Sequence, residues 1–377
     1  MKVLTIGGAT VDTIVTIDDH LIEQMTLSNA DASYLLLEVG RKSEAKAVSV
    51  HCGGGAINTG VAMARLGHDV STVVKIGRDL GASMILSQLS AEGVSPRYAL
   101  HHDQAPTGTS IFIAAHDRNT AVITFRGANT TLTLDDLDNV SFAFDLVYVA
   151  SLSDQSADCF PDIVSRAKSA GALVAANPGI RQLSTRQGAF WTALANIDIL
   201  SLNRTEAAAL VPGLLTRGGH CSPCHEPDFQ TRPPVPRDTP ELVHCGFACG
   251  DGHTMALAAF CQTLTTLGPR WVVVTDGKDG AYIGTPSHLT LCPALPVDIV
   301  GTAGAGDAFN ATFAAFIQSG VGIDHAAIAA AINSASVVGH LDTQTGLLQR
   351  QHLEVQIKQK RDGMALRHWS HDQAVAE

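Results

Sequence analysis

The sequence predicts an α/β fold in which a mainly parallel central sheet carries helices and a second, smaller β-sheet stands beside it. From residue 145 onward, short apolar runs alternate with amphipathic stretches, as in consecutive strand–helix–strand units. Before residue 127, four stretches of alternating polar and apolar residues come in two pairs with no helix inside either pair, which is typical of β-hairpins. A chain of 377 residues is long enough to bury a complete core in such a fold.

The first part of the chain is expected to contribute one core strand, both hairpins, and two helices with a strand between them. Gly53, Gly54 and Gly55 come directly before an apolar helical pattern that stops at Gly67. The other expected elements are a strand at 3–6, a hairpin of 33–39 with 45–50, a strand at 70–76, a helix at 81–92 and a hairpin of 107–115 with 120–126. The two hairpins should pair in a small sheet of their own.

The second part of the chain is expected to supply most of the parallel sheet. Its expected strands lie at 146–150, 173–176, 197–202 and 271–275, and its expected helices at 159–170, 189–195, 206–210 and 323–341. The tail after residue 349 is polar and charged, and it suggests no function.

Residues 298–317, which read DIVGTAGAGDAFNATFAAFI, carry the strongest chemical signal. Gly304, Ala305 and Gly306 form a small-residue loop, and Asp307 then opens an apolar run with helical spacing. A helix start offers unpaired backbone N–H groups and the positive end of the helix dipole, so an anion such as a phosphate is expected there. Taken alone, Asp307 is read most simply as a helix cap. A carboxylate beside a phosphate is also suited to take a proton from an attacking hydroxyl.

Other polar residues follow predicted strands and the glycine-rich turn. Asp12 lies shortly after the first strand, and Asn203 and Glu206 lie just beyond the strand at 197–202, where open α/β sheets bind ligands. Asn58 lies one turn into the helix after the three glycines, which permit close backbone approach to a ligand. Each of these signals alone fits turn capping or packing as well as binding.

The composition of the chain excludes some classes of binding partner and indicates its cellular compartment. The formal net charge of −11 argues against nucleic acid or an anionic membrane as the main partner. No apolar run approaches the roughly 20 residues needed to span a bilayer, and the N-terminal MKVLTIGG reads as a first strand and not as a signal peptide. We therefore expect a cytoplasmic protein whose eight cysteines are reduced thiols or metal ligands.

Residues 211–254 form an insertion that is rich in Pro, His and Cys and has little hydrophobic periodicity. Cys221 and Cys224 form a C-x2-C pair, and Cys245 and Cys249 form a C-x3-C pair. Such pairs predict a structural zinc site, because four thiolates around Zn²⁺ can fold a segment too small to bury a core. The alternative is a disordered loop whose cysteines are unconnected.

The order of these motifs resembles the ribokinase-like (PfkB) family of sugar and nucleoside kinases from residue 1 to about residue 348. GGGAINTGVAMARLG at 53–67 resembles the N-terminal signature of that family, and GTAGAGDAFNATF at 301–313 resembles its C-terminal signature. Between them, IGRDLG, PTGTS, NRTE and TDGKDGA fall in the family's order. The resemblance implies a ribokinase-like three-layer fold with a small β-sheet lid that closes over the phosphate acceptor and excludes water.

The resemblance also implies roles for individual residues. Asp307 would be the catalytic base, and the backbone N–H groups of the Gly304–Ala305–Gly306 loop and of Asp307 would stabilise the transferring phosphoryl group. The acceptor would be held by Asp12, Gly54, Gly55 and Asn58. Asn203 and Glu206 would organise Mg²⁺ through water, Thr275 and Gly277 would touch the ATP phosphates, and Asn333 would lie in the adenine pocket.

Four parts of the chain are expected on this basis. They are a kinase core (1–12, 51–100 and 127–349), a lid (13–50 and 101–126), the insertion at 211–254 within the core, and the tail at 350–377. In some members of the family the lid makes the dimer contact, so a homodimer through the lid is one expectation.

The expected activity is ATP-dependent phosphorylation of a hydroxymethyl group on a small sugar. A nucleoside kinase of the same fold and a binding or regulatory protein without catalysis are the alternatives. The family's C-terminal signature usually has Asp and Thr where this chain has Gly301 and Ala303. The Asp lies beside a monovalent cation in members that need one, so a requirement for K⁺ stays open here, with Asp298 as a substitute ligand.

Overall fold

The computed structural model describes residues 1–17, 23–26, 33–36, 40, 42–114, 120–223 and 240–371. Within these residues ten strands form one central sheet, parallel from β7 to β16 and antiparallel from β16 to β19. In spatial order the strands are β7 (Ser95–His101), β6 (Asp69–Ile76), β1 (Lys2–Ile6), β10 (Leu146–Val149), β11 (Leu173–Ala176), β12 (Ile199–Asn203), β16 (Trp271–Thr275), β17 (Ala281–Gly284), β18 (His288–Cys292) and β19 (Arg367–Ser370). The predicted mainly parallel sheet is confirmed.

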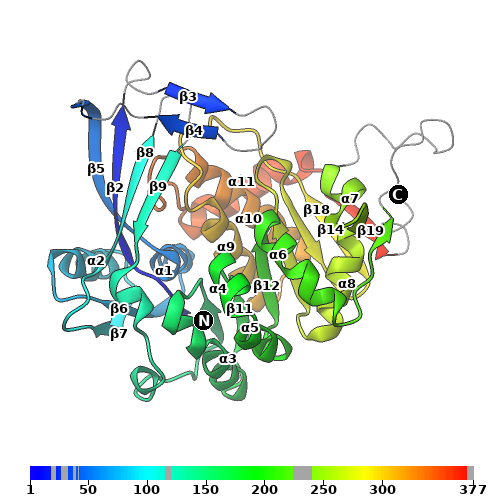
Figure 1. The fold of residues 1–377 in the computed structure, drawn as a ribbon, viewed down its shortest axis with the longest axis horizontal. Helices are drawn as coiled ribbons and strands as arrows, with labels where there is room; N and C mark the ends of the chain where they lie inside the picture. Colours follow the sequence, from blue (N-terminus) through cyan, green and yellow to red (C-terminus); the bar gives the residue numbers. More distant parts are fainter. Residues whose placement is uncertain are drawn as a thin grey trace.

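Helices cover both faces of this sheet, so the core has three layers (Figure 1). Apolar residues alternate between the two faces: Val147 and Val149 belong to one buried cluster, and Leu146 and Tyr148 belong to the other. The first cluster includes residues of α3 (Phe160–Ser169), α4 (Ile180–Thr185), α5 (Gln187–Ala193), α6 (Arg204–Leu215), α7 (Glu241–Cys245) and α8 (Leu257–Leu267). The second includes residues of α1 (Gly55–Arg65), α2 (Leu80–Ala91), α9 (Ala305–Gln318), α10 (Ile323–Val338) and α11 (Arg350–Lys360). Among the described residues, no helix combines the length and apolar character that a membrane span requires.

A separate four-stranded sheet stands beside the core, as predicted, but one of its pairings differs from the prediction (Figure 1). Its order is β5 (Ala45–Gly53), β2 (Thr10–Ile17), β8 (Gly108–Ala114) and β9 (Thr120–Phe125). The pair β8–β9 is the expected second hairpin. The expected first hairpin is wrong, because the partner of β5 is β2.

The segment expected to pair with β5 lies elsewhere. Residues 33–36 form β4 and pair with β3 (Glu23–Thr26) in a two-stranded sheet, while residues 37–39 lie outside the described part. The missed strand β2 reads TVDTIVTI, which is rich in β-branched residues and buries alternate side chains. That alternation is the signal that identifies it as a strand.

The described part of the insertion does not form the predicted zinc site. Cys221 and Cys249 form a disulfide, so neither supplies a thiolate, and the expectation that all cysteines are thiols or metal ligands is also wrong. Cys245 is exposed, and Cys224 lies outside the described residues. In the part of the chain that is described, no three His, Cys, Asp or Glu residues are grouped as metal ligands.

Apolar packing explains why the insertion folds without such a site. A small sheet of β13 (Ser222–Pro223), β15 (His253–Met255) and β14 (Phe247–Gly250) follows the helix α6. Phe247 is buried and packs against Phe260 of α8, with ring centroids 4.7 Å apart. Leu242, Val243 and Met255 join the same buried cluster. The insertion therefore shares the core of the protein and does not depend on a core of its own.

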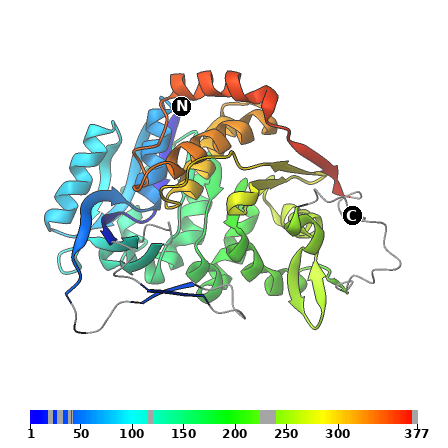
Figure 2. The same cartoon turned by 90° about the horizontal axis from the view of Figure 1, so that it is seen from above.

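The polar tail is part of the core fold. Helix α11 lies along α10, and the chain then runs to β19 at the edge of the sheet (Figure 2). Leu353 and Ile357 bury the inner face of α11, and Trp369 of β19 is buried in the cluster on the other side.

Candidate active site

The carboxyl ends of β12 and β16 bring the predicted nucleotide-side residues together. Asn203 is the last residue of β12 and lies opposite Thr275, the last residue of β16. Gly277 follows Thr275 by two residues and has a φ of 55°, in the left-handed region that favours glycine. Glu206 lies in the first turn of α6, directly after β12. The structure thus places these four residues at one edge of the sheet.

Asn203 and Glu206 cap the start of α6 reciprocally. The Glu206 N–H donates to Asn203 Oδ1 (2.8 Å), and the Asn203 N–H donates to Glu206 Oε2 (2.8 Å), which is a capping box. Burial and the negative charge of Asp307 raise the pKa of Glu206 to about 7, although the Asn203 N–H and the Asn177 side chain oppose the rise. The raised pKa shows that no positive charge among these groups offsets the burial of the Glu206 carboxylate, and a bound cation would supply such a charge.

The loop before α9 brings the start of that helix to the site. Gly304 has a left-handed φ of 78°, and a Cβ at this position would come within 2.7 Å of Thr343 Cβ. No side chain among the described residues caps the helix. The Ala305 N–H makes a long bond of 3.4 Å to Thr302 O, and Gly306 is exposed with open space beside its Cα. The start of α9 therefore presents backbone donors that an anion can reach.

Asp307 lies in the first turn of α9 and faces α1. Asn58 Nδ2 donates to Asp307 Oδ2 (2.8 Å). Burial raises the pKa of Asp307 to about 6, and the negative charge of Asp12 adds to the rise, while the bond from Asn58 opposes it. Such a carboxylate is ionised at neutral pH and still basic enough to accept a proton.

Asp12 lies on β2 of the four-stranded sheet and is only 5% exposed. Its Oδ1 is buried and has no hydrogen-bond partner among the described residues. Burial raises the pKa of Asp12, although hydrogen bonds from the hydroxyls of Thr10 and Ser110 and the charge of His51 act to lower it. A Cβ on Gly53 would collide with Asp12 Oδ2, so the glycine at 53 makes room for the carboxylate. An unpartnered buried acceptor is suited to receive a ligand hydroxyl.

The space around Asp12 is a pocket between the four-stranded sheet and the core. Its walls come from both sides: Asp12, Ile14, His51 and Phe112 on the sheet, and Ala303, Leu341, Asp342 and Thr343 on the core. A larger pocket of about 610 Å³ shares His51 and Asp342 with it and extends over α2.

Gly54 and Gly55 are explained by backbone packing. Gly54 has a φ of 95° and begins α1, and a Cβ there would come within 2.5 Å of Gly8 O. A Cβ on Gly55 would come within 2.7 Å of Ala150 Cβ. The glycines let α1 approach the ends of β1 and β10 closely, and their contact with a ligand stays a prediction.

The side chain of Asn333 is hydrogen-bonded within the core. Its Nδ2 donates to Thr312 Oγ1 (2.8 Å), and its Oδ1 accepts from the Leu348 N–H (2.9 Å). The residue is fully buried in α10. It holds α9 and the segment after α10 together, and its place in the adenine pocket stays a prediction.

The absence of aspartate at position 301 also has a structural reason. A Cβ on Gly301 would come within 2.8 Å of His340 O, because the backbone after α10 passes close by. A larger side chain would have to displace that backbone. Asp298, the proposed substitute ligand for a monovalent cation, is exposed, and the requirement for such an ion stays open.

Two features of the site were not predicted. Tyr148 of β10 is fully buried, and burial, together with the charges of Asp307 and Glu206, raises its pKa well above the ordinary value. Its hydroxyl therefore keeps its proton next to both carboxylates. In the sequence Tyr148 is one apolar residue in a buried strand, so no local signal marks it.

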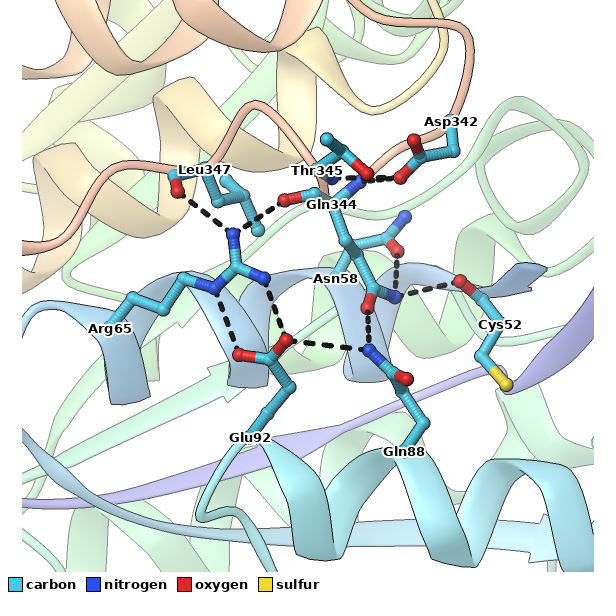
Figure 3. Close-up of polar contacts among 9 residues, drawn as sticks. All are labelled: Cys52, Asn58, Arg65, Gln88, Glu92, Asp342, Gln344, Thr345 and Leu347. Atoms are coloured by element: carbon cyan, nitrogen blue, oxygen red, sulfur yellow. Dashed lines mark hydrogen bonds and ion pairs between the residues drawn. The ribbon is translucent and has the colours of Figure 1, made fainter.

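The second unpredicted feature is a polar network behind Asn58 (Figure 3). Thr343 Oγ1 and Gln344 Nε2 both donate to Asn58 Oδ1, at 2.8 and 3.2 Å. Arg65 donates to Gln344 O (2.7 Å) and pairs with Glu92 through two bonds of 2.9 and 2.6 Å. Thr343 and Gln344 follow a long helix without any periodic pattern, so no sequence signal singles them out.

Comparison with known proteins agrees with this geometry. The model of the pfkB family carbohydrate kinases matches residues 14–216 and 239–350, which is most of the chain. The chain belongs to this family, as its motifs predicted. The gap in the match lies within the Cys-rich insertion.

Individual relatives are distant but similar in length. The ribokinase of Bacillus subtilis is 26% identical over 307 residues, covering 80% of this chain and 86% of the relative. The deoxyribokinase of Salmonella typhimurium is 26% identical over 315 residues, covering 81% and 86%.

Solved structures confirm the predicted fold. A ribokinase from Thermotoga maritima superimposes with a TM-score of 0.69 at 19% identity, covering 94% of this chain and 99% of the other. The Arabidopsis thaliana ribokinase complexed with ribose and ATP gives 0.68 at 21% identity, covering 94% and 98%. At such identities the similarity establishes the fold and leaves the substrate undefined.

Proposed function

We propose that the chain is an ATP-dependent kinase that transfers the γ-phosphoryl group to a hydroxymethyl group of a small sugar, with Asp307 as the base. The observation that carries this proposal is the half-buried carboxylate of Asp307 at the uncapped start of α9, which Asn58 contacts and whose pKa is raised to about 6. A base and an anion-binding helix start in one place are what phosphoryl transfer to a hydroxyl requires.

On the nucleotide side, the backbone N–H groups at 305–307 would stabilise negative charge on the transferring group. Thr275 and Gly277, beside Asn203 at the ends of β16 and β12, would contact the ATP phosphates. Glu206 and Asn203 offer the oxygen atoms that Mg²⁺ prefers, and the raised pKa of Glu206 fits a position near that ion. They would hold Mg²⁺ through water, and the ion would supply positive charge at the phosphates.

On the acceptor side, the unpartnered Oδ1 of Asp12 would accept a sugar hydroxyl, and Asn58 would contribute its amide. Asp307 would take the proton of the attacking hydroxyl as the new O–P bond forms. We propose that the four-stranded sheet is the lid, since Asp12, Ile14, His51 and Phe112 reach from it into the acceptor pocket. Its closure would exclude water and so protect ATP from hydrolysis.

Phe112 favours one second candidate. Its ring lines the pocket that contains Asp12, where it could stack on a nucleobase, so a nucleoside is the alternative acceptor. An aromatic side chain on a lid strand is equally suited to packing on a sugar.

The test follows Mg²⁺-dependent ADP release from ATP with separate pools of sugars, sugar acids and nucleosides. We expect one sugar pool to stimulate release and Asp307→Asn to reduce turnover by orders of magnitude with ATP binding nearly unchanged. The control Asp69→Asn, on an exposed residue at the amino end of β6, should behave as the parent. Stimulation by nucleosides alone would establish the second candidate. ATP binding without stimulation by any pool would favour a binding or regulatory protein, and near-parental turnover of Asp307→Asn would refute the proposed base.

We also propose that the lid forms a homodimer contact. Its outer strands β5 and β9 expose large apolar side chains, with exposed fractions of 60% for Val48, 60% for Ile123 and 58% for Phe125. Exposed apolar groups gathered on one sheet are typical of an interface. Light scattering should give twice the chain mass for the parent and the chain mass for Val48→Lys, whereas a monomeric parent would refute the contact.

A further inference from the structure

The Asn58 amide receives hydrogen bonds on one side and donates on the other. Its Oδ1 accepts from Thr343 Oγ1 (2.8 Å) and Gln344 Nε2 (3.2 Å), and its Nδ2 donates to Asp307 Oδ2 (2.8 Å). Asn58 itself is 5% exposed, and Thr343 and Gln344 are also buried. Protein groups therefore bond to both ends of this amide, and these groups decide which end faces Asp307.

The orientation of Gln344 is fixed by its own neighbours (Figure 3). Its Nε2 also donates to Cys52 O (2.7 Å), and its Oε1 accepts from Gln88 Nε2 (3.0 Å). Because Cys52 O can only accept, the NH₂ group of Gln344 must stay on the side of Cys52 and Asn58. A reversed Asn58 would place its NH₂ against this NH₂ group and its oxygen against the carboxylate of Asp307.

The backbone that carries these residues is held by an ion pair. Arg65 donates to Gln344 O (2.7 Å) and Leu347 O (2.8 Å), and Glu92 fixes the guanidinium through both carboxylate oxygens. The Arg65 and Glu92 side chains are only 16% and 18% exposed. Buried, bidentate pairing of this kind fixes geometry more firmly than a surface pair does.

We infer that Thr343 and Gln344 are positioning residues, which orient the Asn58 amide so that it donates to Asp307 and holds that carboxylate ready to accept a proton. The inference rests on the proposed function, in which Asp307 is the base. It assigns a task to two side chains that follow α10 and hydrogen-bond to Asn58.

The hydrogen bond from Asn58 matters because other groups near Asp307 act in the opposite direction. Asp12 from β2 and Glu206 from α6 both interact unfavourably with a negative charge on Asp307, and Tyr148 from β10 is buried beside it. The donor from Asn58 favours the ionised form against this repulsion. Without it, Asp307 would hold its proton to a higher pH.

Matched substitutions separate the hydrogen bond from the packing. Thr343 packs against Gly304, so Thr343→Val keeps the shape and removes the donor, whereas Thr343→Ser keeps the donor and removes the methyl group. Gln344→Met removes the second donor. Thr345→Val is the control, because it makes the same chemical change two residues away. Thr345 is exposed, and it is bonded to Asp342 and not to Asn58.

The first readout is the pH profile of kcat/KM for ADP release with the stimulating acceptor. We expect the acid limb to move upward by about one pH unit in Thr343→Val and in Gln344→Met, the effect of losing one hydrogen bond to a carboxylate. The acid limbs for Thr343→Ser and Thr345→Val should lie at the same pH as that of the parent. Coincident profiles for all four variants would overturn the inference and leave the proposed kinase activity standing.

A second readout does not require activity. The stability difference between each variant and its Asp307→Asn double mutant, followed against pH by urea denaturation, reports the pKa of Asp307 in the folded chain. We expect this curve to shift upward by about the same amount in Thr343→Val and not in Thr345→Val. A shift without kinase activity would support the positioning and refute the function, and an unshifted curve would overturn the positioning.

Discussion

Replacing Asp307 by asparagine should make the protein more stable at neutral pH while it abolishes the proposed catalysis. The pKa of the carboxyl rises from 3.8 to about 6 in the folded chain, chiefly because the group is buried. A difference of roughly two units corresponds to about 3 kcal/mol of destabilisation when the carboxylate is ionised. An acidic residue in the first turn of a helix gains about 0.3–1 kcal/mol from the helix dipole, which the substitution removes. Burial is the larger effect, and a net gain of about 2 kcal/mol is expected.

The gain in stability of Asp307→Asn over the parent should increase with pH. Because the folded-state pKa lies above the unfolded value, the folded chain holds the proton more tightly, and the ionised carboxylate is unfavourable above pH 6. This destabilisation decreases as the pH falls through 6 and disappears below 3.8, where both states are protonated. In the Asp307→Asn variant the new amide oxygen can still accept the bond from Asn58, so Asn58 Nδ2 keeps its acceptor.

Urea denaturation of the parent and Asp307→Asn at pH 4, 5, 6, 7 and 8 measures this difference directly. The midpoints should lie close together near pH 4, separate between pH 4 and 6, and differ by a nearly constant amount above pH 7, with the variant more stable. Asp298→Asn, on an exposed residue ahead of α9, is the control and should change little at any pH. A variant that is equally or less stable at pH 8, or a gain that is the same at every pH, would refute the argument.

Three further outcomes are expected. Since the pKa of Glu206 is raised to about 7, the half-saturating Mg²⁺ concentration for ADP release should fall as the pH rises through 7, and Glu206→Gln should remove that dependence. Gly55→Ala places a Cβ 2.7 Å from Ala150 Cβ and should lower the free energy of unfolding by about 1–3 kcal/mol in urea denaturation. Gly306 has open space beside it, so Gly306→Ala should lower the free energy of unfolding far less in the same experiment. The disulfide between Cys221 and Cys249 closes a loop with a sequence separation of 28. Because the disulfide restricts the unfolded chain, Cys221→Ala should lower the free energy of unfolding by up to about 3.5 kcal/mol. A melting temperature that a reductant does not change would contradict this prediction.

Local sequence signals located most of the candidate site. The small residues before Asp307, the glycines before Asn58 and the Asn-x-x-Glu spacing at 203–206 each determine a turn or a helix start over a few residues. Because such features form within one turn of chain, their positions could be read without knowledge of the fold. The structure brings Asp12, Asn58 and Asp307 together as the family pattern implied.

Contacts between distant segments were less predictable. The pairing of β2 with β5 joins segments about 35 residues apart, and the alternation of apolar residues defines a strand without naming its partner. Asn333 and Gln344 are both polar residues in the same region, and their spacing does not reveal that one is enclosed in the core and the other supports Asn58. The disulfide likewise joins cysteines from different predicted pairs, and cysteine spacing does not determine connectivity.

The position of β19 has a practical consequence for handling the protein. An outermost strand shields the unpaired backbone of its neighbour, and here the shield for β18 comes from the last described residues of the chain. His371 secures it, with its N–H bonded to Ser287 O (3.2 Å) and its Nε2 bonded to Thr285 O (2.6 Å). An affinity tag fused close behind residue 371 would strain these bonds, and a truncation before β19 would leave an edge open to pairing with other chains. Poor solubility of a shortened chain should therefore be traced first to the exposed edge of β18.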